Sequence, residues 1–289
     1  MLAGMSTRLR VSIVVIGDEI LGGFVQDTNS HWLAQRLHAL GVPLERVVTV
    51  PDELDAIREA LLGELSRARP RVVLTCGGIG STPDDLTMEA VAHSLGLALE
   101  RQPDIDARIT MALEWTARQG VDVTDQHERS MRKMAMVPAG SYLLSGAQGV
   151  APGVALDVDG GSNAGGATIV ILPGVPHELQ RITEHGIEPL LLDGKGEPQH
   201  VAELQHPYPE STLNPVLERI VADYPDVHLG SYPGRVCTIR IKGPRERVEA
   251  AMALVREHLT TLDADESTQR LKAAWQERWA GRESPRPAS

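Results

Sequence analysis

Three short apolar runs that alternate with helical patterns constrain the fold of this chain more than any other feature. The runs are rich in β-branched residues and cover residues 11–16, 44–50 and 72–75. Between them, leucine and isoleucine recur at the spacing of amphipathic helices that begin near Asn29 and Leu54. Further along the chain, helices are predicted over about 103–119 and 126–136. Short apolar runs joined by helices are typical of strands buried on both faces of a parallel sheet. We therefore predict an α/β fold with three layers, in which helices cover both faces of a doubly wound, mostly parallel sheet.

The chain is long enough for a second domain. At about 150 residues per domain, its 289 residues predict two domains. Residues 193–198 have the composition of a linker, and the pattern then changes to strand, helix, strand, strand, helix. We expect a larger α/β domain over 8–195, a smaller α+β domain over 198–262 and a polar tail over 263–289. The tail is expected to hold one helix and to be disordered over 281–289.

The composition argues against several classes of protein. Asp and Glu outnumber Lys and Arg by 39 to 28, and the net charge of -11 repels nucleic-acid phosphates. Aromatic residues make up only 3%, which leaves few platforms for base stacking. No apolar run approaches the roughly 20 residues of a membrane helix, and two cysteines make no disulfide framework. We expect a cytoplasmic protein with a small-molecule ligand and neither a nucleic-acid nor a membrane partner.

The segment after the third apolar run carries the strongest functional signal. It reads TCGGIGSTPDDLT, and its candidate residues are Thr75, Gly77, Gly78, Gly80, Ser81, Thr82, Asp84 and Asp85. Glycines after a buried strand let backbone N–H groups approach a ligand, and such a loop before a helix favours anions. Two aspartates would repel a bare phosphate, so the combination favours a divalent cation that bridges carboxylate and phosphate. The alternative is a sharp turn whose aspartate caps the helix, which the length of the loop disfavours.

Further acidic residues follow the first two apolar runs. The segment GDE at 17–19 and the segment DTN at 27–29 follow the first run, and Asp52 follows the second. The carboxyl ends of parallel strands form one edge of a sheet, where ligands bind. The candidates at this edge are therefore Gly17, Asp18, Glu19, Asn29 and Asp52. For Asp27 and Asp52, capping of the next helix is an equally good interpretation.

Other catalytic motifs are absent. Pro83 stands where GxGxxG needs its last glycine, and GxxxxGK[ST] does not occur. His177-Glu178 begins like the zinc motif HExxH, but its fifth position is Arg181. No GxSxG occurs either. These absences disfavour a standard dinucleotide dehydrogenase, a P-loop NTPase, a zinc protease and an α/β-hydrolase. Arg132 and Lys133 could reach a phosphate, but they share a predicted helix with Met131, Met134 and Met136, which favour a face packed on the core over a binding face.

Taken together, the motifs resemble those of the molybdopterin-binding (MoaB/Mog-like) domain. They resemble more closely the N-terminal part of the CinA family and the matching FAD-hydrolase domain of eukaryotic FAD synthases. The motifs are GDEILGG with DTN, VPDE, GGIGSTPDDLT, KMAMVP, GVAPG, LPGVP and GSYP, in order over about residues 11–260. Full-length CinA proteins also carry a C-terminal amidase domain, for which this chain is too short, so we expect a stand-alone form.

The resemblance implies a site and its chemistry. It implies catalytic roles for Asp52 and Asp85, metal binding by Asp52, Asp84 and Asp85, and contact of the glycine loop, Pro173 and Gly174 with a phosphate-bearing ligand. The implied cofactor is Mg²⁺ or Co²⁺, with K⁺ assisting. The implied reaction is hydrolysis of the diphosphate of an ADP-containing dinucleotide such as ADP-ribose or FAD.

Two other functions stay open. One is binding or adenylylation of molybdopterin in molybdenum-cofactor synthesis, and the other is non-catalytic binding of a nucleotide or pterin. The resemblance also implies a homo-oligomer. The chain departs from the family at Ser81, where proline is usual, and at Ser145, near which asparagine is usual. We expect the first change to be tolerated and the second to weaken a substrate contact.

Overall fold

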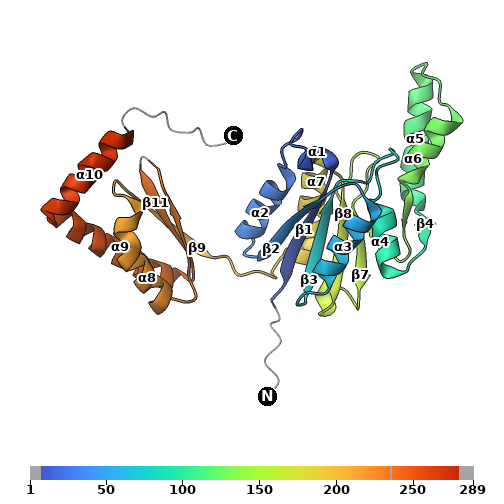
Figure 1. The fold of residues 1–289 in the computed structure, drawn as a ribbon. Helices are drawn as coiled ribbons and strands as arrows, with labels where there is room; N and C mark the ends of the chain where they lie inside the picture. The colour runs from blue at the N-terminus through green and yellow to red at the C-terminus, as the bar shows by residue number, and fades with distance from the viewer. Residues whose placement is uncertain (1–7, 235, 280–289) are drawn as a thin grey trace. The chain divides into compact units, whose positions relative to one another are not determined.

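The computed structural model describes residues 8–279 apart from residue 235. The chain forms two compact units, Met1–Pro198 and Gln199–Ser289, whose elements are labelled in Figure 1. The first unit is built on a six-stranded sheet in the order β2-β1-β3-β8-β7-β6. Its first four members are parallel and the last two pair antiparallel. The strands are β1 (Arg10–Ile16), β2 (Leu44–Val50), β3 (Arg71–Cys76), β8 (Ala167–Leu172), β7 (Val154–Val158) and β6 (Tyr142–Leu143).

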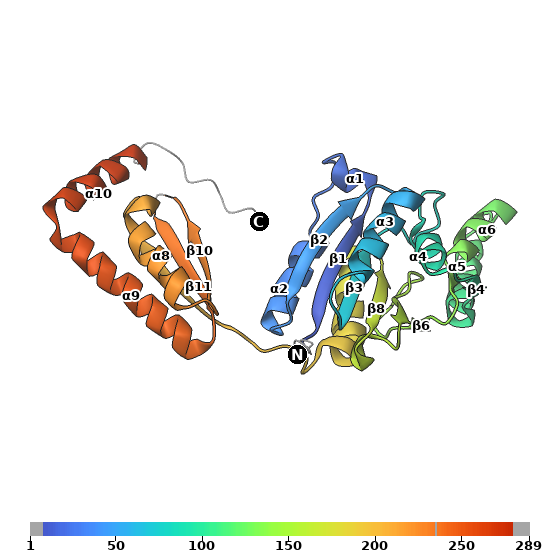
Figure 2. The same ribbon diagram turned by 60° about the horizontal axis from the view of Figure 1, so that its bottom comes forward.

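Helices cover both faces of this sheet (Figures 1 and 2). One face packs against α2 (Asn29–Ala39), α7 (Pro176–Ile182) and the π-helix η2 (Thr183–Leu192) that continues α7. The other face packs against α3 (Leu54–Leu65) and α4 (Thr87–Leu95), and the buried side chains of α5 (Pro103–Arg118) belong to the same core cluster. Because β1 and β3 have helices on both sides, their side chains are buried along almost their whole length. The predicted three-layer, mostly parallel α/β fold is confirmed.

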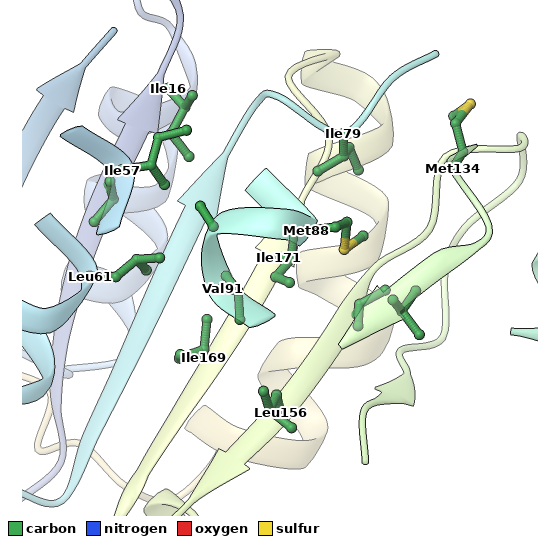
Figure 3. Close-up of a cluster of buried hydrophobic side chains, with 14 of the residues drawn as sticks. Ile16, Ile57, Leu61, Ile79, Met88, Val91, Met134, Leu156, Ile169 and Ile171 are labelled. Carbon is green, nitrogen blue, oxygen red and sulfur yellow. The ribbon is translucent and has the colours of Figure 1, made fainter. Parts of the chain in front are cut away.

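The core between the sheet and α3 and α4 also holds the glycine loop in place (Figure 3). Leu61 of α3 and Val91 of α4 pack with Ile169 of β8 in this cluster. Ile79, from the middle of the loop, points into the same cluster near Met88 and is only 5% exposed. Burial of one isoleucine stabilises a fold by about 1.5–3 kcal/mol. The loop is therefore anchored by a core side chain, although its neighbours are polar.

One predicted helix is shorter than expected. The pattern predicted a helix over about 126–136, whereas α6 (Asp125–Lys133) ends earlier and β5 (Met136–Pro138) follows. The backbone leaves the helix because β5 pairs antiparallel with β4 (Leu99–Arg101). This pairing partner is distant in the sequence, so local periodicity could not reveal it. A four-residue helix, α1 (Asp18–Leu21), also forms where only a loop was predicted.

The second unit has a three-stranded antiparallel sheet in the order β10-β11-β9. The predicted succession of strand, helix, strand, strand, helix is confirmed, with a further helix in the tail. The elements are β9 (His200–His206), η3 (Glu210–Leu213), α8 (Asn214–Asp223), β10 (His228–Tyr232), β11 (Cys237–Gly243), α9 (Arg245–Ala264) and α10 (Glu266–Trp279). α10 contacts its own unit, because Gln269 Nε2 donates to the Tyr208 hydroxyl at 2.9 Å. The predicted disorder over 281–289 lies outside the described residues.

No helix within the described residues has the length and hydrophobicity needed to cross a bilayer.

Candidate functional site

A pocket of about 470 Å³ lies at the carboxyl ends of the parallel strands. Its walls come from the segments that follow β1, β2, β3 and β8. This volume is within the range of about 300–1,000 Å³ that is usual for small-molecule sites. The predicted residues that line it are Glu19, Asn29, Asp52, Gly77, Gly78, Gly80, Asp84, Asp85, Pro173 and Gly174. Residues far apart in the sequence thus meet at the edge of the sheet where ligands were expected.

Five predicted residues are not on the pocket wall, namely Gly17, Asp18, Thr75, Ser81 and Thr82. Thr75 is fully buried inside β3. Asp18 and Thr82 contact residues that line the pocket: the Asp18 N–H donates to Asp52, and the Thr82 N–H donates to Asp85. Gly17 comes just before α1, and a Cβ there would collide with the Glu19 carboxylate at 2.8 Å.

The glycine loop has a backbone that other residues would not tolerate. Gly77 and Gly78 have φ angles of +102° and +65°, in the region that favours glycine. A Cβ on Gly77 would lie 2.3 Å from the Ile16 carbonyl oxygen, so the loop folds tightly against the end of β1. The Thr87 hydroxyl fixes this fold by donating to the Gly77 carbonyl at 2.8 Å.

The loop also presents a run of free donors. Within the described part of the chain, the N–H groups of residues 78–81 donate to no protein acceptor. Gly78, Ile79 and Gly80 of this run line the pocket. Unpaired backbone N–H groups are rare in folded proteins unless water or a ligand satisfies them. Consecutive free N–H groups next to a helix start are suited to bind phosphate oxygens.

Asp85 and Lys133 hold the loop from two sides. The Asp85 carboxylate accepts from the Thr82 N–H at 2.8 Å and from the Thr82 hydroxyl. Lys133 Nζ donates to the Thr82 carbonyl at 3.0 Å. Lys133 thus contacts the loop itself. Arg132, by contrast, is paired with Asp106 at 2.8 Å and with Glu128. The ion pairs of Arg132 disfavour the prediction that it reaches a phosphate, and for Lys133 this stays a prediction.

The two aspartates that were equally good as helix caps behave differently. Asp27 accepts from the Ser30 N–H in the first turn of α2 at 3.0 Å, as a helix cap does, and it also lines the pocket. Asp52 caps no helix: α3 begins after Glu53 without a side-chain cap. Instead, Asp52 Oδ2 accepts from the Asp18 N–H at 2.8 Å. That bond crosses from β2 to the start of α1 and turns Asp52 toward the pocket, whose wall it joins.

Asp52 lies in a negative environment. Its pKa is raised above the ordinary value, chiefly because burial removes the carboxylate from water and also because of the charges of Glu19, Asp18 and Asp84. The Asp18 N–H acts in the opposite direction. Among the described residues, no Lys or Arg forms an ion pair with Asp52, Asp84 or Asp85. Asp84 differs from Asp52, because hydrogen bonding with the Thr82 side chain, together with the charge of Lys133, lowers its pKa. A cation on this wall would be stabilised chiefly by the negative charges around Asp52.

The carboxylates do not form a complete metal cage by themselves. In residues 8–279 without 235, no group of three or more His, Cys, Asp or Glu side chains is arranged to hold a metal ion. Asp85 also has one carboxylate oxygen occupied by Thr82. However, Mg²⁺ usually takes only one or two protein carboxylates and completes its shell with phosphates and water. Asp52 and Asp84 fit a cation of that kind, bound together with a phosphate ligand.

Several pocket residues were not predicted from the sequence. Met134 and Ala151 come from the segments after α6 and β6, and Glu178 comes from the first turn of α7. In these regions the sequence offered only the motifs KMAMVP, GVAPG and LPGVP of the family resemblance, which did not identify an individual side chain as a pocket residue. Cys76 also lines the pocket, but burial raises the pKa of its thiol, so it stays protonated and is a poor nucleophile.

Comparisons with known proteins identify the family of this chain. A family described as "Probable molybdopterin binding domain" matches residues 12–193. A protein of Pyrobaculum calidifontis is 35% identical over 225 residues, which cover 76% of this chain and 79% of that one. A CinA-like protein of Citrifermentans bemidjiense is 38% identical over 183 residues, but these cover 63% of this chain and only 41% of that protein. The crystal structure of a CinA protein "with unknown function" from Thermoplasma acidophilum matches with a TM-score of 0.52 and 30% identity, over 64% of this chain and 98% of that one.

Proposed function

This chain belongs to the family described as "Probable molybdopterin binding domain", and on that premise we propose that its pocket binds a phosphate-bearing ligand with a divalent cation and hydrolyses the ligand's diphosphate. The substrate class we propose is an ADP-containing dinucleotide, of the ADP-ribose or FAD type. The products would be AMP and the second phosphate ester.

One observation carries this proposal. The free N–H groups of residues 78–80 and the carboxylates of Asp52 and Asp84 belong to the same pocket. The N–H groups suit phosphate oxygens, whereas the carboxylates suit a cation. A ligand that brings both a diphosphate and its counter-cation satisfies each group, and neither a bare anion nor a neutral molecule does so.

The residues of the chain would then act in distinct ways. A divalent cation, when bound, supplies neutralisation of the diphosphate charge and polarisation of its P–O bonds. Asp52 and Asp84 would hold that cation. The N–H groups of Gly78 and Gly80 would donate hydrogen bonds to the phosphoryl oxygens and so stabilise the negative charge that grows there during attack by water. Asp85 would keep the loop in shape through its bonds with Thr82.

The test is chromatographic assay of AMP release from ADP-ribose and FAD. We expect AMP only when Mg²⁺ or Co²⁺ is present with K⁺, and none after addition of a chelator. Asp85→Ala should lose turnover while its circular dichroism stays unchanged. The matched control is Asp122→Ala, which removes an exposed aspartate outside the pocket and should keep full turnover. Equal activity of Asp85→Ala and the control would contradict the assignment.

A second candidate is binding of a nucleotide or pterin without hydrolysis, or with adenylyl transfer to molybdopterin. Two observations favour it: the description of the family that matches, and the lack of a three-ligand metal group among the described residues. Binding alone predicts that nucleotide or pterin raises the melting temperature in the presence of metal while no product forms. Release of AMP from ADP-ribose would exclude it.

A further inference from the structure

Two hydrogen-bond acceptors in the pocket lack donors. Asn29 Nδ2 donates to the Gly174 carbonyl at 2.7 Å, which fixes the orientation of the amide. Its Oδ1 is buried and has no hydrogen-bond partner. The Glu178 carboxylate also lines the pocket, and within the described residues no side chain or N–H donates to it. We call the Asn29 Oδ1 and the Glu178 carboxylate the acceptor corner.

The Glu178 carboxylate is fixed by the backbone opposite to it. Its Oε1 lies 2.6 Å from the position that a Cβ on Gly149 would take. Glycine at 149 therefore makes room for this carboxylate. Glu178 also belongs to the first turn of α7, where a negative charge is favoured by the helix dipole. This second effect would hold a glutamate there without any ligand, so a test must separate the two roles.

The pocket thus offers complementary chemistry at two places. The glycine loop offers N–H donors, whereas the acceptor corner offers only acceptors. Phosphate oxygens can satisfy the loop, but they would be repelled by Glu178 and can give nothing to Asn29 Oδ1. Hydroxyl groups can donate to both atoms. A carboxylate that receives the hydroxyls of a ribose is a recurring arrangement in nucleotide-binding α/β folds.

We propose that Glu178, with Oδ1 of Asn29, accepts hydrogen bonds from the sugar hydroxyls of a nucleotide whose phosphates lie on the glycine loop. This inference rests on the proposed function and adds a residue that determines specificity for ribose. It assigns the acceptor corner no part in the chemical step.

Charge provides a sharp control. A Glu178→Gln substitution removes a negative charge from a pocket for a polyanion. If Glu178 has no bond to the sugar, charge alone makes the variant bind nucleotide diphosphates more tightly. If Glu178 accepts from the hydroxyls, the variant loses charge-assisted hydrogen bonds and binds ribonucleotides less tightly. The two roles therefore predict changes of opposite sign.

The experiment is calorimetric titration of the full chain with three probes, each in Mg²⁺ and K⁺: inorganic diphosphate, ADP and 2′,3′-dideoxy-ADP. The proteins are the wild type, Glu178→Gln and the matched control Glu184→Gln, which removes an exposed glutamate outside the pocket. We expect the wild type to prefer ADP to dideoxy-ADP by about tenfold, as lost bonds to a charged acceptor predict. Glu178→Gln should lose most of this preference, while its affinity for diphosphate is unchanged or higher. Glu184→Gln should behave as the wild type.

Two results would overturn the inference. Equal wild-type affinity for ADP and dideoxy-ADP, or tighter ADP binding by Glu178→Gln, would show that the sugar does not reach the acceptor corner, while diphosphate binding would leave the proposed function intact. Failure of the wild type to bind either diphosphate or ADP would instead refute the proposed function, and this inference with it.

Discussion

At the amino ends of β1, β2 and β3 charged side chains pair with one another, whereas at the carboxyl ends of the same strands they do not. Arg71 starts β3 and is fully buried, and it donates to Ser12 and to Glu45. Glu64 at the end of α3 is also buried, and it accepts from the Ser12 hydroxyl at 2.6 Å. Arg46 and Arg67 lie within 3.5 Å of the same carboxylate. We call these residues the lower network.

At the opposite end, Asp52 has acidic neighbours and no basic partner among the described residues. Buried charges that pair with each other matter for stability, because removal of one partner leaves the other charged and without solvent. Charges without a partner cost stability and are retained where an external group binds them. The charged groups at the amino ends therefore find their partners within the chain, whereas under the proposed function a cation and a ligand would supply the partners at the carboxyl ends.

The largest expected effect is the loss of activity in Asp52→Asn, at the carboxyl ends of the strands. Asparagine keeps an acceptor for the Asp18 N–H but removes the charge that would hold the cation. We expect AMP release from ADP-ribose to fall by about a thousandfold, as loss of a principal electrostatic contact predicts. The measurement is steady-state turnover, with thermal melting as the check that the fold persists. A variant with normal turnover would show that Asp52 holds no cation.

Arg71→Met, at the amino ends of the strands, should lower the stability of the fold, whereas Asp52→Asn lowers activity. It removes the buried guanidinium that donates to Ser12 and Glu45 and lies 3.7 Å from the buried Glu64 carboxylate, so the free energy of unfolding should fall by about 3 kcal/mol. Chemical denaturation measures this loss. Arg58→Met is the control, because Arg58 pairs with the exposed Asp55 and should change stability by less than about 0.5 kcal/mol. Equal losses in the two variants would mean that the lower network does not stabilise the fold.

Lys133→Met tests whether this lysine holds the glycine loop in place. Without the bonds from Nζ to the Thr82 and Pro83 carbonyls, the loop is held less firmly over the pocket. We expect KM for ADP-ribose to rise by about tenfold, which corresponds to about 1.4 kcal/mol. Arg129→Met, an exposed neighbour on α6 without such a contact, is the control. If KM stays normal in Lys133→Met, the loop does not depend on this lysine.

The smallest expected effect concerns the pH dependence of stability. The pKa of Asp52 is raised in the folded chain, so the folded state binds its proton more readily than the unfolded state does. Its stabilising contribution is present below the unfolded pKa of about 3.8 and is lost as pH rises through the folded value. Asp52→Asn should therefore be slightly more stable than the wild type at neutral pH.

The measurement is the melting temperature of both proteins, without added metal, from about pH 3 to about pH 8. It shows which of the two proteins is more stable at each pH. The difference should shrink as the pH falls toward the unfolded pKa. A variant that is less stable than the wild type at neutral pH would show that the bond to the Asp18 N–H outweighs the repulsion.

Much of this arrangement was predictable from local patterns. The β-branched runs identified β1, β2 and β3, and the rule that parallel strands share one edge placed Asp52 beside Asp84 and Asp85. Features that depend on distant pairing were not predictable. Arg71 and Glu64 are ordinary charged residues in the sequence, and only the packing of α3 on the sheet buries them together. Likewise, Glu178 reaches the pocket because β8 lies beside β3.

The interpretation of Asp52 shows why a site cannot be completed from local rules. Its place before a helix made a cap as plausible as a site residue, and the bond to the Asp18 N–H comes from another strand. Asp27 occupies a similar local position and accepts from an N–H group in the first turn of its helix. The difference lies in which backbone groups the fold brings near each carboxylate.

The most direct test of the central claim is to locate a cation by anomalous diffraction, in crystals grown with Mn²⁺ and a non-hydrolysable analogue of ADP-ribose. The account predicts an anomalous peak at coordination distance from Asp52, about 2.0–2.2 Å, with the analogue's phosphates between it and the N–H groups of the glycine loop. Phosphates seated on the loop without a peak beside Asp52 would contradict the claim that the acidic carboxyl end of the sheet is completed by a cation.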